Sequence, residues 1–391
     1  MNLSAFLRLV LLMVFCLPGL IQAQEEDLVD SVASNRSAKV RRNQGRNLMF
    51  TPFLAPSFAP ETDLMINAGG LISWSFDKSD TTLQRTALPF FLGYSTNGSF
   101  AANVRPSLFT RNDRVRVTGD VWLRDMPDNY WGVGYESATN TPKGDSTTAY
   151  TRHWWMVFLR ITYKIKPSLY GGILIDFNHT KARDLNPVMA EDPNVLNDGT
   201  NISNNAVGLI VQYDTRDVLI NAYRGVFAEL SFIEYGRLLG GDFSYRAVNL
   251  DLRHYIPVRR PGRTLAFQVR SRWTGGDVPW PEMSTFGTPF DLRGYTMGWF
   301  RDKTVLFGIS EYRHMFMRQT PRRNGSYMSR FGFATWLATG SIAENYGGLK
   351  NWLPNGGVGI RYEVQPRMNA RVDLGIGRNI NAFYISFNEA F

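Results

Sequence analysis

The sequence predicts an all-β fold, a 16-stranded antiparallel transmembrane β-barrel with a long loop folded into the lumen. The first observation is composition: the chain of 391 residues is 14% aromatic and contains 35 glycines, yet its mean hydropathy is only −0.23. The second is that no stretch of about eighteen apolar residues follows the N-terminal segment, which excludes helical membrane spans. The third is a recurring alternation of apolar and polar residues, typical of strands that face lipid on one side and a polar lumen on the other.

The N-terminal residues are expected to precede the barrel. Residues 1–23 contain one charge, Arg8, then an apolar stretch and the small residue Ala23, which is the pattern of a signal peptide. Residues 24–60 are highly charged at first and proline-punctuated later, so we expect a flexible periplasmic lead-in. The barrel is then expected to occupy residues 61–391.

Strand positions follow from the alternation. Between Arg114 and Arg124, valine, glycine and leucine fall on one face, while arginine, threonine and aspartate fall on the other. Runs of about nine to fourteen residues suit a tilted strand that crosses a bilayer, whereas strands of a soluble sandwich have about five or six. Segment 129–138 is the weakest strand, and it is kept because an even number places both chain ends in the periplasm. The sixteen expected strands are 64–77, 87–96, 99–110, 114–125, 129–138, 151–164, 167–180, 203–213, 225–236, 243–256, 263–273, 303–316, 328–340, 354–364, 367–378 and 382–391.

Connection lengths predict the orientation in the membrane, because such barrels have short periplasmic turns and long outer loops. The tight turns expected in the periplasm are Asn97-Gly98, Lys166-Pro167 and Gln365-Pro366. The long polar connections expected outside are about 78–86, 139–150, 181–202, 274–302 and 341–353. Aromatic residues near the ends of the runs, Trp336 among them, are interpreted as interfacial girdles.

Several classes of function are disfavoured. The formal net charge of +9 is spread over many expected strands, which fits lumen-facing arginines and contact with anionic lipids better than nucleic acid. No GxSxG, HExxH, P-loop or dinucleotide-binding pattern occurs and the four histidines are dispersed, so we expect no enzyme. The only cysteine, Cys16, lies in the expected signal peptide, so no disulfide and no cysteine-ligated metal is expected. No other metal and no cofactor is expected either.

The most informative motif lies in the longest loop, where Asp291-Leu292-Arg293-Gly294-Tyr295 is followed by a strand with Glu311-Tyr312-Arg313. Three further landmarks are the stretch 213–217 with Arg224-Gly225 at a turn, GGVGIRYEVQPRMNARVDLGIGR at 356–378, and the last strand AFYISFNEAF. Together these stretches resemble the BamA/TamA superfamily of outer-membrane assembly and translocation barrels, the bacterial surface antigen family. The resemblance covers about residues 60–391 and implies a loop that folds back into the lumen with an Arg-Gly-aromatic tip.

The residues of the loop motif suggest how the tip is held. A guanidinium in a confined lumen must meet acceptors, because its desolvation is otherwise uncompensated. Glu311 and Arg313 share one strand face, the lumen face if Tyr312 points outward, so Arg293 is expected to pair with Glu311. Gly294 would let the backbone approach the wall closely. A solvent-exposed loop arginine is the alternative.

The chain also departs from the family pattern. The strand after the loop strand usually brings an aspartate before its glycine, but Ala338 stands there, so Asp373 or Glu363 is expected to substitute. The periplasmic repeat domains by which the family captures client chains are expected to be missing.

Closure of the barrel is expected from the last strand, paired with the first strand at 64–77. An open edge would leave backbone groups unsatisfied in hydrocarbon. The resemblance implies that this seam is weakly paired. Four alternating residues of the last strand are expected to touch lipid: Phe383, Ile385, Phe387 and Phe391.

Three functions are compatible with these observations, all of them in the outer membrane. The resemblance implies assembly or translocation of proteins through a loop-plugged lumen and the seam, with outer-membrane lipids and client outer-membrane or secreted proteins as partners. A passive solute channel with an arginine-lined lumen is the first alternative. A structural surface antigen is the second.

Overall fold

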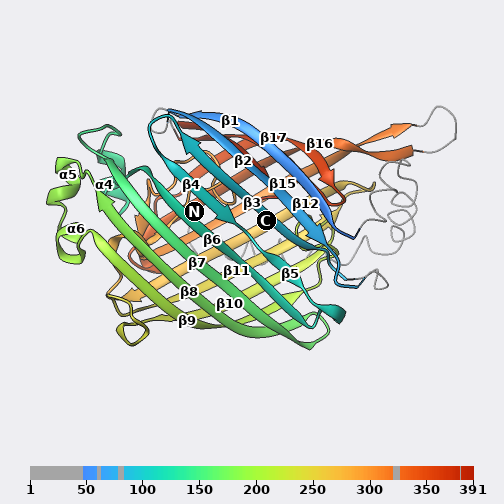
Figure 1. Ribbon diagram of the computed structural model, residues 1–391, viewed down its shortest axis with the longest axis horizontal. Helices are drawn as coiled ribbons and strands as arrows, with labels where there is room; N and C mark the ends of the chain where they lie inside the picture. The colour runs from blue at the N-terminus through green and yellow to red at the C-terminus, as the bar shows by residue number, and fades with distance from the viewer. Residues whose placement is uncertain (1–46, 60–62, 78–82, 320–325, 379) are drawn as a thin grey trace.

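Long strands form in this chain because every backbone N–H and C=O group in a bilayer needs a partner, and a curved antiparallel sheet supplies one. The computed structural model describes residues 47–59, 63–77, 83–319, 326–378 and 380–391. Figure 1 shows tilted strands that curl into a barrel, with the helices labelled α4, α5 and α6 together at one end. No helix in these ranges is long and apolar enough to cross a membrane.

Strands make up most of the described chain, and short helices occupy some of its connections. The strands are β1 (Met49–Ala59), β2 (Asp63–Trp74), β3 (Thr86–Ser95), β4 (Phe100–Val104), β5 (Ser107–Phe109), β6 (Val115–Asn129), β7 (Ala149–Lys166), β8 (Leu169–Arg183), β9 (Asn201–Asp214), β10 (Gly225–Tyr235), β11 (Tyr245–Pro257), β12 (Arg263–Gly276), β13 (Ser284–Thr285), β14 (Arg301–Asp302), β15 (Thr304–Gln319), β16 (Ser326–Ala343), β17 (Leu353–Gln365), β18 (Met368–Gly377) and β19 (Ile380–Phe387). The helices are η1 (Arg111–Asp113), α4 (Tyr135–Asn140), α5 (Pro187–Glu191), α6 (Pro193–Asp198), η2 (Arg237–Leu239), η3 (Trp280–Glu282) and η4 (Tyr346–Gly348).

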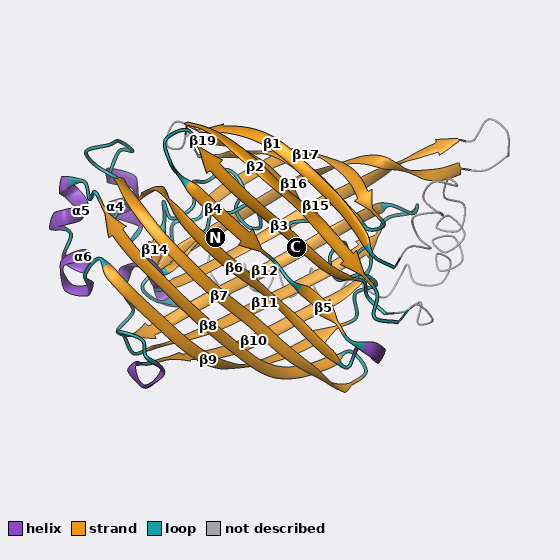
Figure 2. Cartoon of the chain, in the orientation of Figure 1, coloured by secondary structure: helices purple, strands orange, loops and turns teal. Residues whose placement is uncertain are grey.

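Neighbouring strands pair antiparallel along the chain from β1 to β12, then β12 pairs with β15 and the order continues to β19. Strands β4 and β5 lie end to end between β3 and β6 and share one place in the sheet. The sheet has 17 strands, so one shared place leaves sixteen positions among the described residues. The predicted 16-stranded antiparallel barrel is confirmed (Figure 2).

The sixteen positions are not all the predicted ones. Segment 129–138 is a loop that enters α4 rather than a strand, and its residues Gly132 and Gly134 have positive φ angles of 81° and 91°. β1 lies in the expected flexible lead-in 24–60, so the barrel begins at Met49 and not at residue 61. Pro52 and Pro56 misled the prediction, because proline is excluded from central strands but tolerated in an edge strand, and β1 is laddered only to β2. The expected signal peptide and the lead-in before residue 47 lie outside the described residues.

The directions of the strands show at which end of the barrel each connection lies. One end carries α4, α5, α6 and the long connection between β12 and β15. The other carries the start of β1, the end of β19 and residues 110–114, 167–168, 215–224, 258–262 and 366–367. Because outer-membrane barrels have their short turns in the periplasm, the second end is the periplasmic one. The Asn97-Gly98 turn belongs to the long-loop end and the β2–β3 connection to the periplasmic end, so both were predicted at the wrong end.

The edge strands β1 and β19 meet at a seam. Among the described residues no backbone ladder joins them, and the predicted pairing of the last strand with 64–77 is wrong because β2 already pairs with β1 and β3. The rings of Phe53 and Phe387 meet across the seam with centroids 5.1 Å apart. Near the periplasmic end, the Gln365 amide donates to Oγ1 of Thr51 (2.8 Å) and to the backbone oxygen of Leu71 (3.0 Å). Side-chain contacts therefore hold the described part of the seam.

The chain turns into the lumen after β19. Asn388 has a positive φ of 64°, which ends the extended conformation. Phe383 and Ile385 point outward and are 64% and 58% exposed, whereas Phe391 is buried inside the barrel. The prediction that Phe391 touches lipid is therefore wrong. The physical reason is Glu389, whose carboxylate is drawn inward by lumen arginines and carries Phe391 with it.

Candidate functional site: the loop tip and its arginine cluster

The connection between β12 and β15, residues 277–303, folds inward and forms a compact turn before its tip. The Asp291 carboxylate accepts hydrogen bonds from the backbone N–H groups of Gly287 (2.8 Å) and Thr288 (2.7 Å) and from the Thr288 hydroxyl (2.7 Å). Burial raises the pKa of Asp291, against the effect of these hydrogen bonds. The rings of Phe286 and Phe300 stack with centroids 5.7 Å apart. These hydrogen bonds and ring contacts fold the residues before the tip into a turn.

Arg293 at the tip is fully buried and meets three strands of the wall. Its guanidinium forms one ion pair with Glu311 on β15 and another with Asp373 on β18, where Nη1 lies 2.8 Å from Oδ2. The guanidinium carbon lies 3.7 Å from the ring centre of Trp336 on β16. A planar fork that serves two carboxylates and stacks on an aromatic ring suits arginine and not lysine.

Gly294 allows the loop backbone to touch the wall directly. Its φ is 128°, and a Cβ atom there would lie 2.9 Å from backbone atoms of Ile376 and Gly377. On the wall side, a Cβ atom at Gly375 would lie 2.3 Å from the backbone oxygen of Arg293. The loop and β18 therefore approach backbone to backbone, which requires glycine on both sides.

Tyr295 extends the attachment to β17 and β19. Its hydroxyl donates to the backbone oxygen of Pro354 (2.8 Å), and its backbone oxygen accepts from the Tyr384 hydroxyl (3.2 Å). Its ring packs edge-on against Phe286, with centroids 5.9 Å apart. The Arg-Gly-Tyr tip is thus connected to every strand from β15 to β19.

The charges around the tip form one shared network. Inward positions of neighbouring strands lie side by side, and this brings buried charges together. The network consists of four buried arginines and three buried carboxylates: Arg293, Arg313, Arg361 and Arg371 with Glu311, Asp373 and Glu389. Besides the two pairs of Arg293, the pairs are Arg313 with Glu311 (2.7 Å) and with Glu389 (3.8 Å), Arg361 with Asp373 (2.5 Å), with Glu389 (2.9 Å) and with Glu311 (4.0 Å), and Arg371 with Asp373. Every carboxylate is shared, so removal of one member leaves several buried charges poorly compensated.

The sequence-predicted partners are only partly brought together. Glu311, Arg313 and Asp373 lie in the network, but Glu363 does not, because it stands two residues beyond Arg361 toward the periplasmic turn. There its carboxylate accepts from the backbone N–H of Arg367 (2.8 Å).

Sequence reasoning missed four members of the site. Trp336 was predicted in an interfacial girdle, but it is buried in the lumen because it is the direct cross-strand partner of Glu311. Arg361, Arg371 and Glu389 were also missed. The alternation in 356–378 gave their inward direction, but only the strand register shows which inward residues are neighbours.

The loop also contacts the other side of the barrel. Glu282 in η3 lies 3.4 Å from the side-chain amide of Asn178 on β8 and 3.4 Å from the Tyr245 hydroxyl on β11. Its backbone oxygen accepts from Arg272 on β12 (2.8 Å). Burial raises the pKa of Glu282, while the charges of Arg272 and Arg152 oppose this shift. In the described parts of the chain, no group of three or more His, Cys, Asp or Glu side chains is placed to hold a metal ion.

The fold and the site define an outer-membrane β-barrel whose lumen holds an inward-folded loop fixed by a buried arginine. The model of the Omp85 superfamily domain matches residues 72–354. The chain belongs to the Omp85 superfamily, and the resemblance identified from the loop motif is confirmed. No curated protein matches the chain.

Two solved structures share the fold. BamA from Haemophilus ducreyi lacking POTRA domains 1-3 is 13% identical with a TM-score of 0.52, over 88% of this chain and 69% of that one. CdiB from Acinetobacter baumannii is 11% identical with a TM-score of 0.50, over 89% of this chain and 66% of that one. At this identity the likeness concerns the fold.

Proposed function

We propose that this chain assembles proteins into the outer membrane or translocates them across it, with residues 277–303 as a plug of the lumen. Membership of the Omp85 superfamily supports assembly or translocation. The observation that carries the proposal is the position of the loop tip. Arg293 fixes the tip to β15, β16 and β18, and Tyr295 contacts β19, the edge strand of a seam without a described ladder. A barrel that only conducts solutes gains nothing from such a seam, because backbone pairing in lipid is the state of lower free energy.

The plug and the seam have separate roles in this proposal. The plug keeps solutes out of the lumen, since the Arg-Gly-Tyr tip fills the space beside β15–β19. The edges of β1 and β19 offer N–H and C=O groups to an extended segment of a client, which would pair with them as an added strand. Client outer-membrane or secreted proteins are the partners, and outer-membrane lipids surround the barrel.

The test follows the folding of an unfolded outer-membrane protein into vesicles that contain this chain. Cysteines replace Phe53 and Phe387, whose rings meet at the seam, and a gel shift on heating reports the folded client. We expect the reduced barrel to accelerate client folding, the disulfide-closed barrel not to do so, and a reducing agent to restore the effect. Full activity of the closed barrel would contradict the proposal. Large, stable openings of the unmodified chain in a planar bilayer would favour a passive solute channel instead.

A further inference from the structure

We use the name strap for the connection between β9 and β10, residues 215–224. Counted from β1, β9 and β10 hold the eighth and ninth of the sixteen places, whereas β1 and β19 hold the first and the last. The strap therefore leaves the wall opposite the seam. Its ten residues exceed the two that join neighbouring strands in a tight hairpin.

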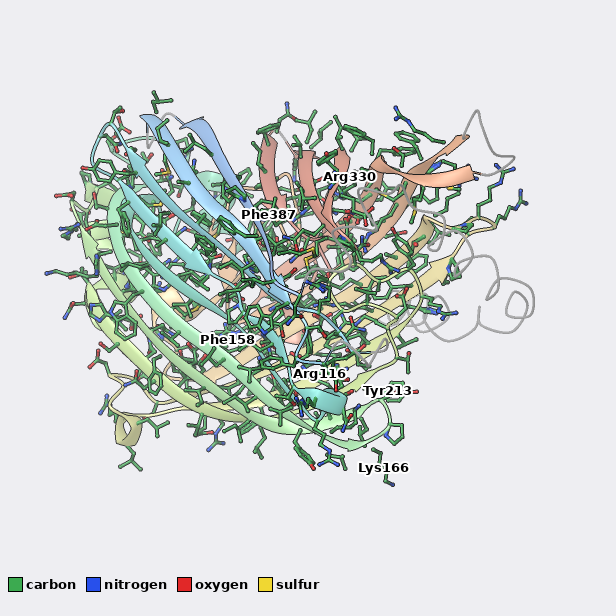
Figure 3. The ribbon with its side chains drawn as sticks, turned by 45° about the vertical axis from the view of Figure 1, so that its right-hand side comes forward. Arg116, Phe158, Lys166, Tyr213, Arg330 and Phe387 are labelled. Atoms are coloured by element: carbon green, nitrogen blue, oxygen red, sulfur yellow. The ribbon has the colours of Figure 1, made fainter. Side chains whose placement is uncertain are left out.

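The base of the strap is held firmly. Asp214, the last residue of β9, pairs with Arg116 on β6 (2.8 Å) and with Arg216 (2.9 Å). The Arg216 guanidinium also donates to the backbone oxygen of Leu219 inside the strap (3.0 Å). Figure 3 shows Arg116 near Tyr213, at the periplasmic end of the barrel. These contacts direct the strap across the periplasmic opening of the barrel.

Asp217 in the strap reaches both flanks of the seam. On one flank, Gln84 of the β2–β3 connection donates to the backbone oxygen of Asp217 (2.9 Å) and accepts from the backbone N–H of Leu219 (3.2 Å). On the other flank, Arg367 in the β17–β18 turn pairs with the Asp217 carboxylate (2.7 Å) and donates to the backbone oxygen of Asn221 (2.7 Å).

Apolar side chains also connect the strap to both flanks of the seam. Ile220 packs on a buried cluster of Leu71 from β2, Ala87 from β3 and Met368 from β18, which again come from both flanks. The backbone N–H of Glu389 lies 3.5 Å from the backbone oxygen of Ile220, so the strap also meets the chain that follows β19. No described ladder joins these two flanks, so contacts with the strap contribute to holding them at a fixed distance from each other.

We propose that the strap is a clasp that keeps the periplasmic end of the seam closed, chiefly through Asp217 and Arg367, and that its release lets the seam open. The two side chains are 17% and 20% exposed, so their ion pair is partly shielded from water. The purpose of an open seam, which is to admit a client protein, rests on the proposed function. The closure of the seam by the clasp does not rest on it.

The experiment measures seam opening in the full barrel in lipid vesicles. Spin labels on cysteines at Phe53 and Phe387 report the fraction of molecules with separated edges by pulsed electron paramagnetic resonance. We expect Asp217→Asn to raise that fraction roughly fivefold, as loss of one partly shielded ion pair implies. Arg367→Gln should raise it by more, because it also loses the hydrogen bond to Asn221 and the contact with the Tyr223 ring. The charge swap Asp217→Arg with Arg367→Asp should lower the fraction in part, because the new arginine cannot accept from the backbone N–H of Tyr223 as Asp217 does. Arg259→Gln, at an exposed arginine of the adjacent β11–β12 turn, is the matched control and should change nothing.

The outcomes separate the clasp from the proposed function. An unchanged separated fraction in both single variants, each still migrating as a folded barrel on an unheated gel, overturns the clasp. An equal rise in Arg259→Gln overturns it too, because the effect would then be one of net charge. If the clasp variants open the seam and leave client folding unaltered, the clasp stands and the proposed function is contradicted.

Discussion

Asp373 shows at the residue scale how the lumen cluster works, because its carboxylate accepts from Arg293, Arg361 and Arg371 at once. Two of these arginines come from the wall and one from the loop. A buried ion-pair network gains little over apolar packing, but it strongly penalises any arrangement that leaves a charge alone. We therefore expect the cluster to fix the position of the loop more than to add stability.

Arg293→Ala should destabilise the barrel strongly. Glu311 and Asp373 would each lose a buried partner, and breaking such a network costs about 3–5 kcal/mol. Urea titration followed by the gel shift on heating measures the loss. Arg293→Lys should lie in between, since it keeps the charge without the fork. Unchanged midpoints, with Arg259→Ala as the surface control, would mean that the network does not hold the loop.

Gly294→Ala should displace the loop tip even though it adds one methyl group. The new Cβ would lie within 3.0 Å of three backbone atoms of Ile376 and Gly377, which cannot rotate away. Gly98→Ala is the matched control, because Gly98 also has a positive φ (86°) but has open space around it. Protease cleavage in residues 277–303 should rise for Gly294→Ala only. Unchanged cleavage in Gly294→Ala would show that the tip tolerates the added methyl group.

The sequence was sufficient for part of this site. The Arg-Gly-Tyr motif and the alternation around Glu311 placed Arg293 and its first partner correctly. Trp336 and Glu389 could not be found in this way. The position of Trp336 depends on the register between β15 and β16, and the position of Glu389 depends on the turn at Asn388. Neither the register nor the turn follows from the pattern of one strand.

At the scale of elements, the loop 277–303 is attached to two sides of the barrel wall, through its tip and through Glu282. The attachment through Glu282 should depend on pH. Burial raises the pKa of Glu282 above its ordinary value of 4.5, so the docked loop binds the proton more tightly than the free loop. Docking is then strongest below that ordinary value and weakens as the pH rises through the raised pKa. The protection of residues 277–303 against hydrogen exchange, measured relative to the intrinsic exchange rate at each pH, should be greater at pH 5 than at pH 8.

Glu282→Gln tests this assignment, because glutamine resembles the protonated carboxyl group. The variant should keep the same high protection at both pH values, whereas Glu191→Gln, at an exposed acid of α5 in another outer connection, should keep the wild-type dependence. A pH dependence that survives in Glu282→Gln would assign it to a different group.

β1 is the element that the sequence did not reveal, and its removal should prevent barrel formation. Without residues 49–59, β2 would lose one of its two partner strands and the chain would start at the wrong end of the membrane. A deletion of 49–59 should give no heat-modifiable band, whereas a deletion of 24–44 should leave that band intact. If both deletions fold, the barrel closes without β1.

Long central strands were predictable because their alternation is strict, as in the charged face of β6. β1 was not, because two prolines and few charges hide its period. Segment 129–138 was mistaken for a strand because its aromatic residues match the composition of a strand, whereas its glycines adopt turn conformations.

At the scale of the whole molecule, the plug should determine conductance. Replacement of residues 285–300 by a short glycine-serine linker would remove Arg293 and the apolar contacts of Tyr295 from the lumen. The shortened barrel should give larger and steadier openings in a planar bilayer than the intact chain. Equal conductance would show that the loop does not restrict passage.

Strand length varies around the wall, and this bears on the surrounding bilayer. β19 at the seam has 8 residues, whereas β7 has 18. At a rise of about 3.4 Å per residue and a tilt of about 45°, these strands reach heights of roughly 19 Å and 43 Å. A hydrocarbon core is about 30 Å thick, so the membrane must thin beside β19 to avoid exposing its chains to water. Acyl chains there will be compressed and less ordered, which lowers the barrier for any segment that enters the bilayer at that place.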